Sequence, residues 1–324
     1  MGRRTSRREF IHAAGFAATG IVAAGQPLAA AEPQARTAQS SASAKTMGAK
    51  FRELLKSGQP FENVGVYDVL TARMTEMMGF RSLWLSSAGV SESYGVPDWS
   101  LISETERLAW CANIAQSVNI PSLMDIDEGG WTPLTLYRSV KKYERAGIGA
   151  VHLTDDISSA GQVKTMPLNE MLDRIHAAID ARSDMVVTAR CGGWTRDGKQ
   201  QTLDRAAAYV EAGAETIWFL GAPLEESPNL AQSIKVPLTM QFFFDNPLSM
   251  AKQLKVTLVV YTSFVNNIAH SAAYDALMEF KNTGTWIKSA RGQRLGQSIP
   301  AEVLAKLLET NEFTERGKKY HLRS

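Results

Sequence analysis

Short apolar runs alternate with amphipathic stretches along the chain from about residue 60. Eight runs have the length of buried strands: 63–67, 82–86, 121–125, 150–154, 185–190, 216–220, 236–241 and 257–261. Segments with helical spacing lie between them, such as 134–146, 168–181 and 203–212, and several end in Ala-Gly, which is typical of a helix C-cap. This alternation predicts an α/β fold, a (β/α)8 TIM barrel, with an extra C-terminal helix that begins at Ala301. An open doubly wound sheet is the alternative, but no Gly-x-Gly-x-x-Gly follows the first strand.

Composition is that of a globular protein. The chain has 324 residues, of which 44% are hydrophobic and 21% charged, enough for one large α/β domain or two ordinary ones. The formal charge is +2, but the first 31 residues hold four arginines against one glutamate and contribute +3, which leaves −1 for the rest. A nearly neutral body argues against binding to nucleic acid.

The first residues have the pattern of an export signal. Arg7 and Arg8 form a twin arginine, a modestly apolar stretch follows at 13–24, and three alanines at 29–31 suit a cleavage site. We therefore expect residues 1–31 to be a twin-arginine signal peptide that delivers the protein to the periplasm. A membrane anchor is the alternative, but the apolar stretch is short and rich in alanine, so no stable anchor is expected.

Residues 32–48 are rich in Ala, Ser, Gln and Thr and predict a flexible leader. Residues 49–324 then form the barrel domain with its helical extension. This part holds two cysteines, Cys111 within a helical stretch and Cys191 at a strand end, and we expect both to be free thiols.

A pair of carboxylates, Asp125 and Asp127, ends the third apolar run and is followed by two glycines. Strand side chains alternate between faces, so the two carboxylates are expected on one face at the strand's C-terminal end. Like charges this close repel unless a cation lies between them, and hard oxygen ligands suit Mg²⁺ or Mn²⁺. A solvated acidic turn before a helix is the alternative.

The other predicted strands also end in polar residues. These are the turn Ser86, Ser87, Ala88 and Gly89, the pair Asp155 and Asp156, and the single residues Arg190 and Gln241. In a barrel they meet at the C-terminal face, where an arginine can grip a carboxylate with two hydrogen bonds and a Ser/Gly turn can hold an anion. Individually, the arginine could be a salt-bridge partner and the serines an ordinary turn.

Several motifs, taken in order, resemble the isocitrate lyase/phosphoenolpyruvate mutase superfamily. Asp125-Ile-Asp-Glu-Gly-Gly is followed by a helix ending in Ala-Gly and a strand ending in acidic residues. Further matching segments are 67–73, 84–89, 95–98, 188–190 and 209–214. The likeness spans nearly the whole chain after the leader.

The resemblance implies a Mg²⁺-dependent enzyme that makes or breaks a C–C or C–P bond beside a 2-oxo or 2-hydroxy carboxylate, through an enolate-type intermediate. It assigns the metal to Asp125 and Asp127, with Asp98 and Asp155 orienting metal-bound water. It assigns the substrate carboxylate to Arg190 and an anion to the turn that begins at Ser86. It also implies a homodimer or homotetramer in which subunits exchange their last barrel helix.

The chain departs from the family pattern at several positions. Thr154 stands where the family has glutamate, and the loop 157–166 lacks the cysteine and histidine of the lyases' Lys-x-Cys-Gly-His. An ordinary isocitrate or methylisocitrate lyase is therefore not expected. Asp156 and Lys164 are the loop groups suited to acid–base catalysis. The alternative is a barrel that has lost catalysis and binds a carboxylate ligand.

Further departures make the expected pocket more apolar. Leu220-Gly221 replaces a glutamate and Gln241 an asparagine, while Trp131, Trp194 and Phe242–Phe244 fall on loops at the active face. The functional interpretation is a substrate with an apolar or aromatic substituent beside its carboxylate. The structural interpretation is that these aromatics cap the barrel.

Overall fold

The computed structural model describes residues 45–159, 162–243, 245–285 and 299–320. The predicted signal peptide and nearly all of the leader lie outside these residues. The first helix, α1 (Met47–Lys56), begins inside the predicted leader, because the Thr46 side chain caps it by accepting the Ala49 N–H at 3.0 Å. Within the described ranges, no helix is long and apolar enough to cross a membrane.

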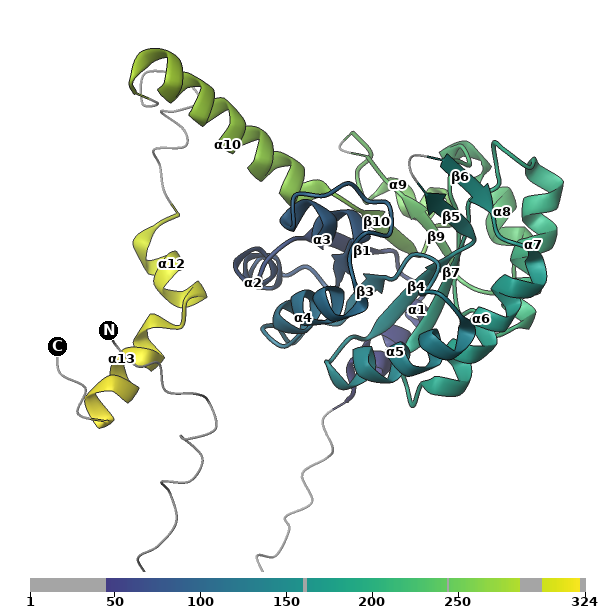
Figure 1. Cartoon of the computed structure of the whole chain (residues 1–324), viewed down its shortest axis with the longest axis horizontal. Coiled ribbons are helices and arrows are strands. Elements are labelled where there is room, and N and C mark those ends of the chain that lie inside the picture. The colour runs from purple at the N-terminus through teal and green to yellow at the C-terminus, as the bar shows by residue number, and fades with distance from the viewer. Residues whose placement is uncertain (1–44, 160–161, 244, 286–298, 321–324) are drawn as a thin grey trace, which may run out of the picture. The chain divides into compact units, whose positions relative to one another are not determined.

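Eight parallel strands close into a barrel (Figure 1). The strands are β1 (Phe61–Val66), β2 (Leu83–Leu85), β3 (Ser122–Asp125), β4 (Ala150–Thr154), β7 (Val186–Cys191), β8 (Ile217–Phe219), β9 (Leu238–Gln241) and β10 (Leu258–Tyr261). They pair in this order, and β10 closes the barrel on β1. Each lies within two residues of a predicted run, so the predicted (β/α)8 barrel is confirmed.

Helices surround the strands, except that the last of them projects away from the barrel along most of its length (Figure 1). They are α2 (Val69–Met77), α3 (Ser87–Ser93), α4 (Glu104–Ala115), α5 (Pro133–Arg145), α6 (Leu168–Ala181), α7 (Lys199–Glu211), α8 (Ser227–Ser233), which a 3₁₀ turn precedes, α9 (Met250–Gln253) and α10 (Phe264–Thr283). Of the three predicted helices named above, 168–181 is found unchanged and the other two are shifted or extended by a few residues.

Alternating side chains of the strands divide the core into two clusters. One fills the barrel interior and includes Trp84, Leu123 and Trp218, with Phe51 and Leu55 of α1 packed against them. The other lies between strands and helices and is larger. Full burial of one such side chain contributes about 1.5–3 kcal/mol, so the two clusters dominate the stability of the barrel.

A small antiparallel hairpin, which the sequence did not predict, follows β4. It consists of β5 (Asp156–Ser159) and β6 (Gln162–Thr165), with Ile157 opposite Lys164. The Met166 N–H donates to the Asp155 carbonyl at 2.7 Å, which fixes the base of the hairpin at the carboxyl rim.

The described residues 299–320 near the C-terminus are largely helical, as expected. α12 (Ala301–Leu307) and α13 (Thr310–Lys319) follow α10. Arg73 of α2 donates to the Leu307 carbonyl at 2.8 Å and pairs with Glu309 at 3.0 Å. α10 is unlike the other barrel helices, because Asn266 is its one buried residue.

Candidate functional site

An acidic cluster lies at the carboxyl rim of the barrel, where β3 ends. Asp125 is the last residue of β3 and is 3% exposed. Asp127 follows in a turn with a φ of +52°, and its N–H donates to Oδ1 of Asp125 at 3.1 Å. The turn continues through Gly129, where φ is +79° and a Cβ would lie 2.8 Å from the Leu153 side chain. The glycine therefore allows the close turn that keeps both carboxylates at the rim.

Asp98 joins this cluster from the loop between α3 and α4. Ser87 Oγ donates to its Oδ2 at 3.1 Å and Ser91 Oγ to its Oδ1 at 3.4 Å. Burial, followed by the charge of Asp127, raises the pKa of Asp98. The three carboxylates of Asp98, Asp125 and Asp127 therefore form one electrostatic group, which we call the acidic cluster.

Burial also raises the pKa of Asp125, to about 7, although Arg190 acts against this rise and Asp127 and Asp98 add to it. A buried carboxylate surrounded by other carboxylates is costly to ionise. A bound cation would stabilise the ionised form, because its charge dominates such a site.

Arg190 faces the acidic cluster from β7, next to β4. Its Nη1 lies 3.4 Å from Oδ2 of Asp125, and its Nε donates to Oγ1 of Thr154 at 3.1 Å. The guanidinium also lies over the Trp218 ring, 5.4 Å from its centroid. Thr154, at the position where the resemblance implies a glutamate, thus orients the arginine without adding a negative charge.

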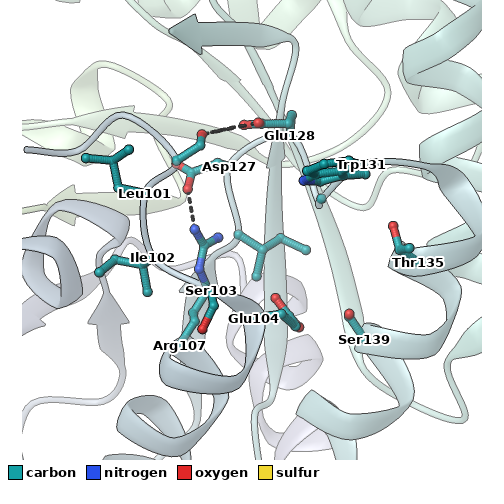
Figure 2. A pocket seen from close by; sticks show the side chains of 13 residues that line it. Leu101, Ile102, Ser103, Glu104, Arg107, Asp127, Glu128, Trp131, Thr135 and Ser139 are labelled. Carbon is teal, nitrogen blue, oxygen red and sulfur yellow. Dashed lines mark hydrogen bonds and ion pairs between the residues drawn. The ribbon is translucent and has the colours of Figure 1, made fainter. Parts of the chain in front are cut away.

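Arg107 is a second arginine at the acidic cluster, and sequence reasoning missed it. Its Nη2 lies 2.7 Å from Oδ2 of Asp127 (Figure 2). The pair borders a cavity of about 360 Å³ that opens between the start of α4 and the start of α5. One signal could have found it: Arg107 occupies the inward helical face that it shares with Cys111 and Ile114.

His152 was also not singled out. It lies on β4 inside the barrel, with Trp84 and Trp218 at centroid distances of 5.4 and 5.3 Å. Its Nδ1 is 2.5 Å from Thr188 Oγ1. Burial, and then the charge of Arg190, lower the pKa of His152 well below its ordinary value, so this imidazole is neutral at pH 7.

The structure separates Asp155 from the acidic cluster. Its Oδ1 accepts the Gly192 N–H at 2.7 Å, and its Oδ2 accepts Arg205 Nε at 2.8 Å and the Tyr209 hydroxyl at 2.6 Å. Neighbouring strand residues face opposite sides, so Asp155 points toward α7 while Thr154 points toward Arg190. The prediction that Asp155 takes part in the metal site is therefore corrected: it anchors α7 to the barrel.

The two predicted acid–base groups lie on the hairpin. Asp156 accepts Arg196 Nη2 at 2.7 Å, and it lies so close to Gly192 that a Cβ there would be 2.0 Å from Oδ2. This ion pair fixes the carboxylate against the loop after β7, which does not suit a group that transfers protons. Lys164 is exposed on β6.

The remaining predicted binding residues lie on the same rim. The turn Ser86–Gly89 leads from β2 into α3, and its Ser87 is the residue that holds Asp98. Gln241 ends β9, and its Nε2 donates to Thr262 Oγ1 at 3.1 Å. The structure thus brings the Ser86 turn together with the acidic cluster, whereas Gln241 is bonded to the loop after β10.

The predicted loop aromatics divide into two groups. Trp131 and Phe243 are exposed, at 94% and 60%. Phe242 is 2% exposed and belongs to the core, and Trp194 is partly buried against the Phe219 ring at 6.3 Å. Phe244 lies outside the described residues. Phe242 therefore packs as a core residue, as in the structural interpretation.

The acidic cluster fits a divalent cation of a particular kind. In the ranges that the structure describes, no three Asp, Glu, His or Cys side chains converge closely enough to hold an ion directly. Mg²⁺ usually keeps several waters and binds through one or two carboxylates. The buried carboxylate of Asp125 and the more accessible carboxylates of Asp127 and Asp98 repel one another and provide the hard oxygen donors for such a hydrated ion.

Comparison with known proteins identifies the family of the chain. The phosphoenolpyruvate phosphomutase family model matches residues 51–281. The 2-methylisocitrate lyase of Shewanella oneidensis is 31% identical over 254 residues, which is 74% of this chain and 87% of the relative. Phosphonopyruvate hydrolase of Variovorax sp. is 32% identical over 182 residues, 53% of this chain and 63% of the relative.

Solved structures show the same fold. Phosphonopyruvate hydrolase in complex with oxalate and Mg²⁺ has a TM-score of 0.75 at 26% identity and covers 85% of this chain and 99% of its own. A 2,3-dimethylmalate lyase has a TM-score of 0.76 at 23% identity, covering 86% and 99%. The chain therefore belongs to the phosphoenolpyruvate phosphomutase family, within the isocitrate lyase/phosphoenolpyruvate mutase superfamily of lyases and hydrolases that its motifs indicated.

Proposed function

We propose that this protein is a Mg²⁺-dependent lyase or C–C bond hydrolase that acts on a 2-oxo or 2-hydroxy carboxylate through an enolate-type intermediate. One observation carries the proposal: the acidic cluster and Arg190 face each other at the carboxyl rim, with the contact between Arg190 and Asp125 at 3.4 Å. The relatives support it, because they are named as lyases and a hydrolase and one is solved with oxalate and Mg²⁺.

The arginine and the acidic cluster have separate roles. Bound Mg²⁺, or Mn²⁺, would supply positive charge for the substrate carboxylate and its 2-oxygen. Arg190, oriented by Thr154 and Trp218, presents a planar fork that suits the substrate carboxylate. Asp125 and Asp127 would hold the cation, and Asp98, which Ser87 and Ser91 hold in place by hydrogen bonds, would orient the water of the cation.

Proton transfer is assigned to the hairpin. Lys164 is exposed on β6, opposite Ile157 in a hairpin whose base lies at the rim, and it is the proposed acid–base group. Asp156 is proposed as a positioning residue instead, since its pair with Arg196 ties the hairpin to the loop after β7. Leu220, partly buried at the end of β8 and packed against the barrel interior, supports a substrate with an apolar substituent.

A panel of 2-oxo and 2-hydroxy acids tests the proposal. Release of pyruvate, glyoxylate or oxalate would be measured with Mg²⁺ and with a chelator. We expect turnover that needs the cation and disappears in Asp125→Asn. Binding of a carboxylate without any turnover would instead establish the alternative, a barrel that has lost catalysis.

We propose also that the protein is exported to the periplasm by the twin-arginine route. The support is the sequence of residues 1–31, with Arg7 and Arg8 before an apolar stretch and a small-residue cleavage site. Twin-arginine export carries folded proteins, which suits a closed barrel whose first strand, β1, pairs with its last, β10.

Assembly by exchange of α10 is a further part of the proposal. Apolar side chains of α10 are exposed: Ile268, Tyr274, Leu277, Met278 and Phe280. A groove of about 380 Å³ lies between β1, the end of α2 and β10, and Val64, Met78 and Leu248 line it. A homodimer or homotetramer would cover both surfaces if α10 of one subunit entered the groove of another.

A further inference from the structure

α4 carries a charged residue on its buried face. Its buried residues are Arg107, Cys111, Ile114 and Ala115, which share the side that faces the barrel. Arg107 is only 7% exposed. A buried guanidinium is costly unless it is paired, so its partner decides what it does there.

That partner is a member of the acidic cluster. Arg107 Nη2 lies 2.7 Å from Oδ2 of Asp127, and Figure 2 shows the guanidinium reaching from α4 to this carboxylate at the edge of the cavity. Glu104, one turn earlier on α4, is occupied on one oxygen by the Tyr143 hydroxyl at 2.9 Å. The close ion pair of Arg107 is therefore with the carboxylate that the proposed cation needs.

We propose that Arg107 is an internal counter-ion that shares Asp127 with the divalent cation and thereby sets how tightly the site binds that cation. The inference rests on the cation of the proposed function. Arg107 occupies Oδ2 of Asp127 and leaves Oδ1 for the ion or its water. The arginine is thus a positioning residue for the metal site and does not touch the substrate.

The direction of the effect follows from charge. When all three aspartates of the acidic cluster are ionised, as a bound cation would favour, they face two arginines and one net negative charge is left; without Arg107 two negative charges remain. Buried charges are screened little by salt, so the arginine repels a divalent ion at close range. Removing its charge should therefore tighten cation binding, although it also removes a contact that stabilises the fold.

Calorimetric titration of the metal-free protein with Mn²⁺ tests this. We expect Arg107→Met to bind at least about tenfold more tightly than the wild type. Arg107→Lys, which keeps the charge, should stay within about threefold. Arg205→Met is the matched control. Arg205 is also a buried arginine, and its Nε lies 2.8 Å from Oδ2 of Asp155, an aspartate outside the acidic cluster. The control variant should lose thermal stability as Arg107→Met does but keep the wild-type affinity.

A second comparison covers the case in which Arg107→Met does not fold. Arg107→Met leaves the charge of Asp127 without its partner, and adding Asp127→Asn removes that charge. The double variant, Arg107→Met with Asp127→Asn, should bind Mn²⁺ at least about tenfold more tightly than Asp127→Asn alone. The inference is wrong if Arg107→Met binds Mn²⁺ no more tightly than the wild type, or if the double variant binds it no more tightly than Asp127→Asn. In that case, binding of Mn²⁺ by the wild type would still support the proposed metal site. Binding by Arg107→Met alone supports the inference. No binding by the wild type, Arg107→Met or the double variant refutes the cation and the inference together.

Discussion

Asp125→Asn should stabilise the metal-free protein at high pH. Burial raises the pKa of Asp125 from the ordinary 3.8 to about 7, so the folded protein binds its proton more tightly than the unfolded chain does. The contribution of Asp125 to the free energy of unfolding is therefore fully present below about pH 4, decreases as the pH rises toward 7 and is lost above pH 7. The difference between the two pKa values corresponds to at most about 4 kcal/mol.

Asparagine removes the charge while keeping the shape. Its carbonyl oxygen can still accept the Asp127 N–H, but the contact with Arg190 at 3.4 Å becomes a weaker one. We therefore expect a net gain of about 1–3 kcal/mol at pH 8. For a domain of this size, each kcal/mol added to the free energy of unfolding raises Tm by about 2–4 °C. The increase in Tm of Asp125→Asn over the wild type should become smaller as the pH is lowered toward 5.

Thermal unfolding followed by circular dichroism at pH 5 and pH 8, with a chelator present, measures the effect. Asp155→Asn is the control, because that carboxylate is bound by Gly192, Arg205 and Tyr209, and its loss should destabilise the protein at both pH values. If Asp125→Asn is less stable than the wild type at pH 8, or if the difference does not change with pH, the electrostatic account of the acidic cluster is wrong.

Three further predictions concern the substrate, export and assembly. Arg190→Lys keeps the charge but loses the fork, so kcat/KM on a carboxylate substrate should fall at least about 100-fold, or about 2.7 kcal/mol; an unchanged value would make Arg190 structural. Replacing Arg7 and Arg8 with lysine should trap the protein in the cytoplasm, as seen by cell fractionation, and efficient export of that variant would contradict the twin-arginine proposal. Leu277→Glu on α10, where Leu277 is 70% exposed, should convert an oligomer into monomers in light scattering, whereas Glu302→Gln on α12 should not; an unchanged mass for the leucine variant argues against helix exchange.

The sequence by itself determined the barrel and the position of its catalytic face. Strand and helix periods are local properties, so eight apolar runs separated by amphipathic stretches were enough to place every strand of the barrel within two residues. The turn Asp-x-Asp-x-Gly-Gly could also be predicted from the sequence. Its residues follow one another at the end of a single strand, so they lie together in any fold that contains this strand. Arg190 was readable as a strand end on the same rim.

Only the tertiary structure decided which of the other polar residues share that site. Thr154 and Asp155 are neighbours in sequence, but Thr154, the last residue of β4, faces Arg190, whereas Asp155, the next residue, faces α7. Arg107 lies 20 residues from Asp127, on a helix whose pattern predicts an apolar inward face, and their contact depends on how α4 packs against the barrel. Asp156 likewise became an ion-pair partner because the hairpin folds over Gly192. Pairings between separate elements depend on packing distances of a few ångströms, which a one-dimensional pattern does not contain.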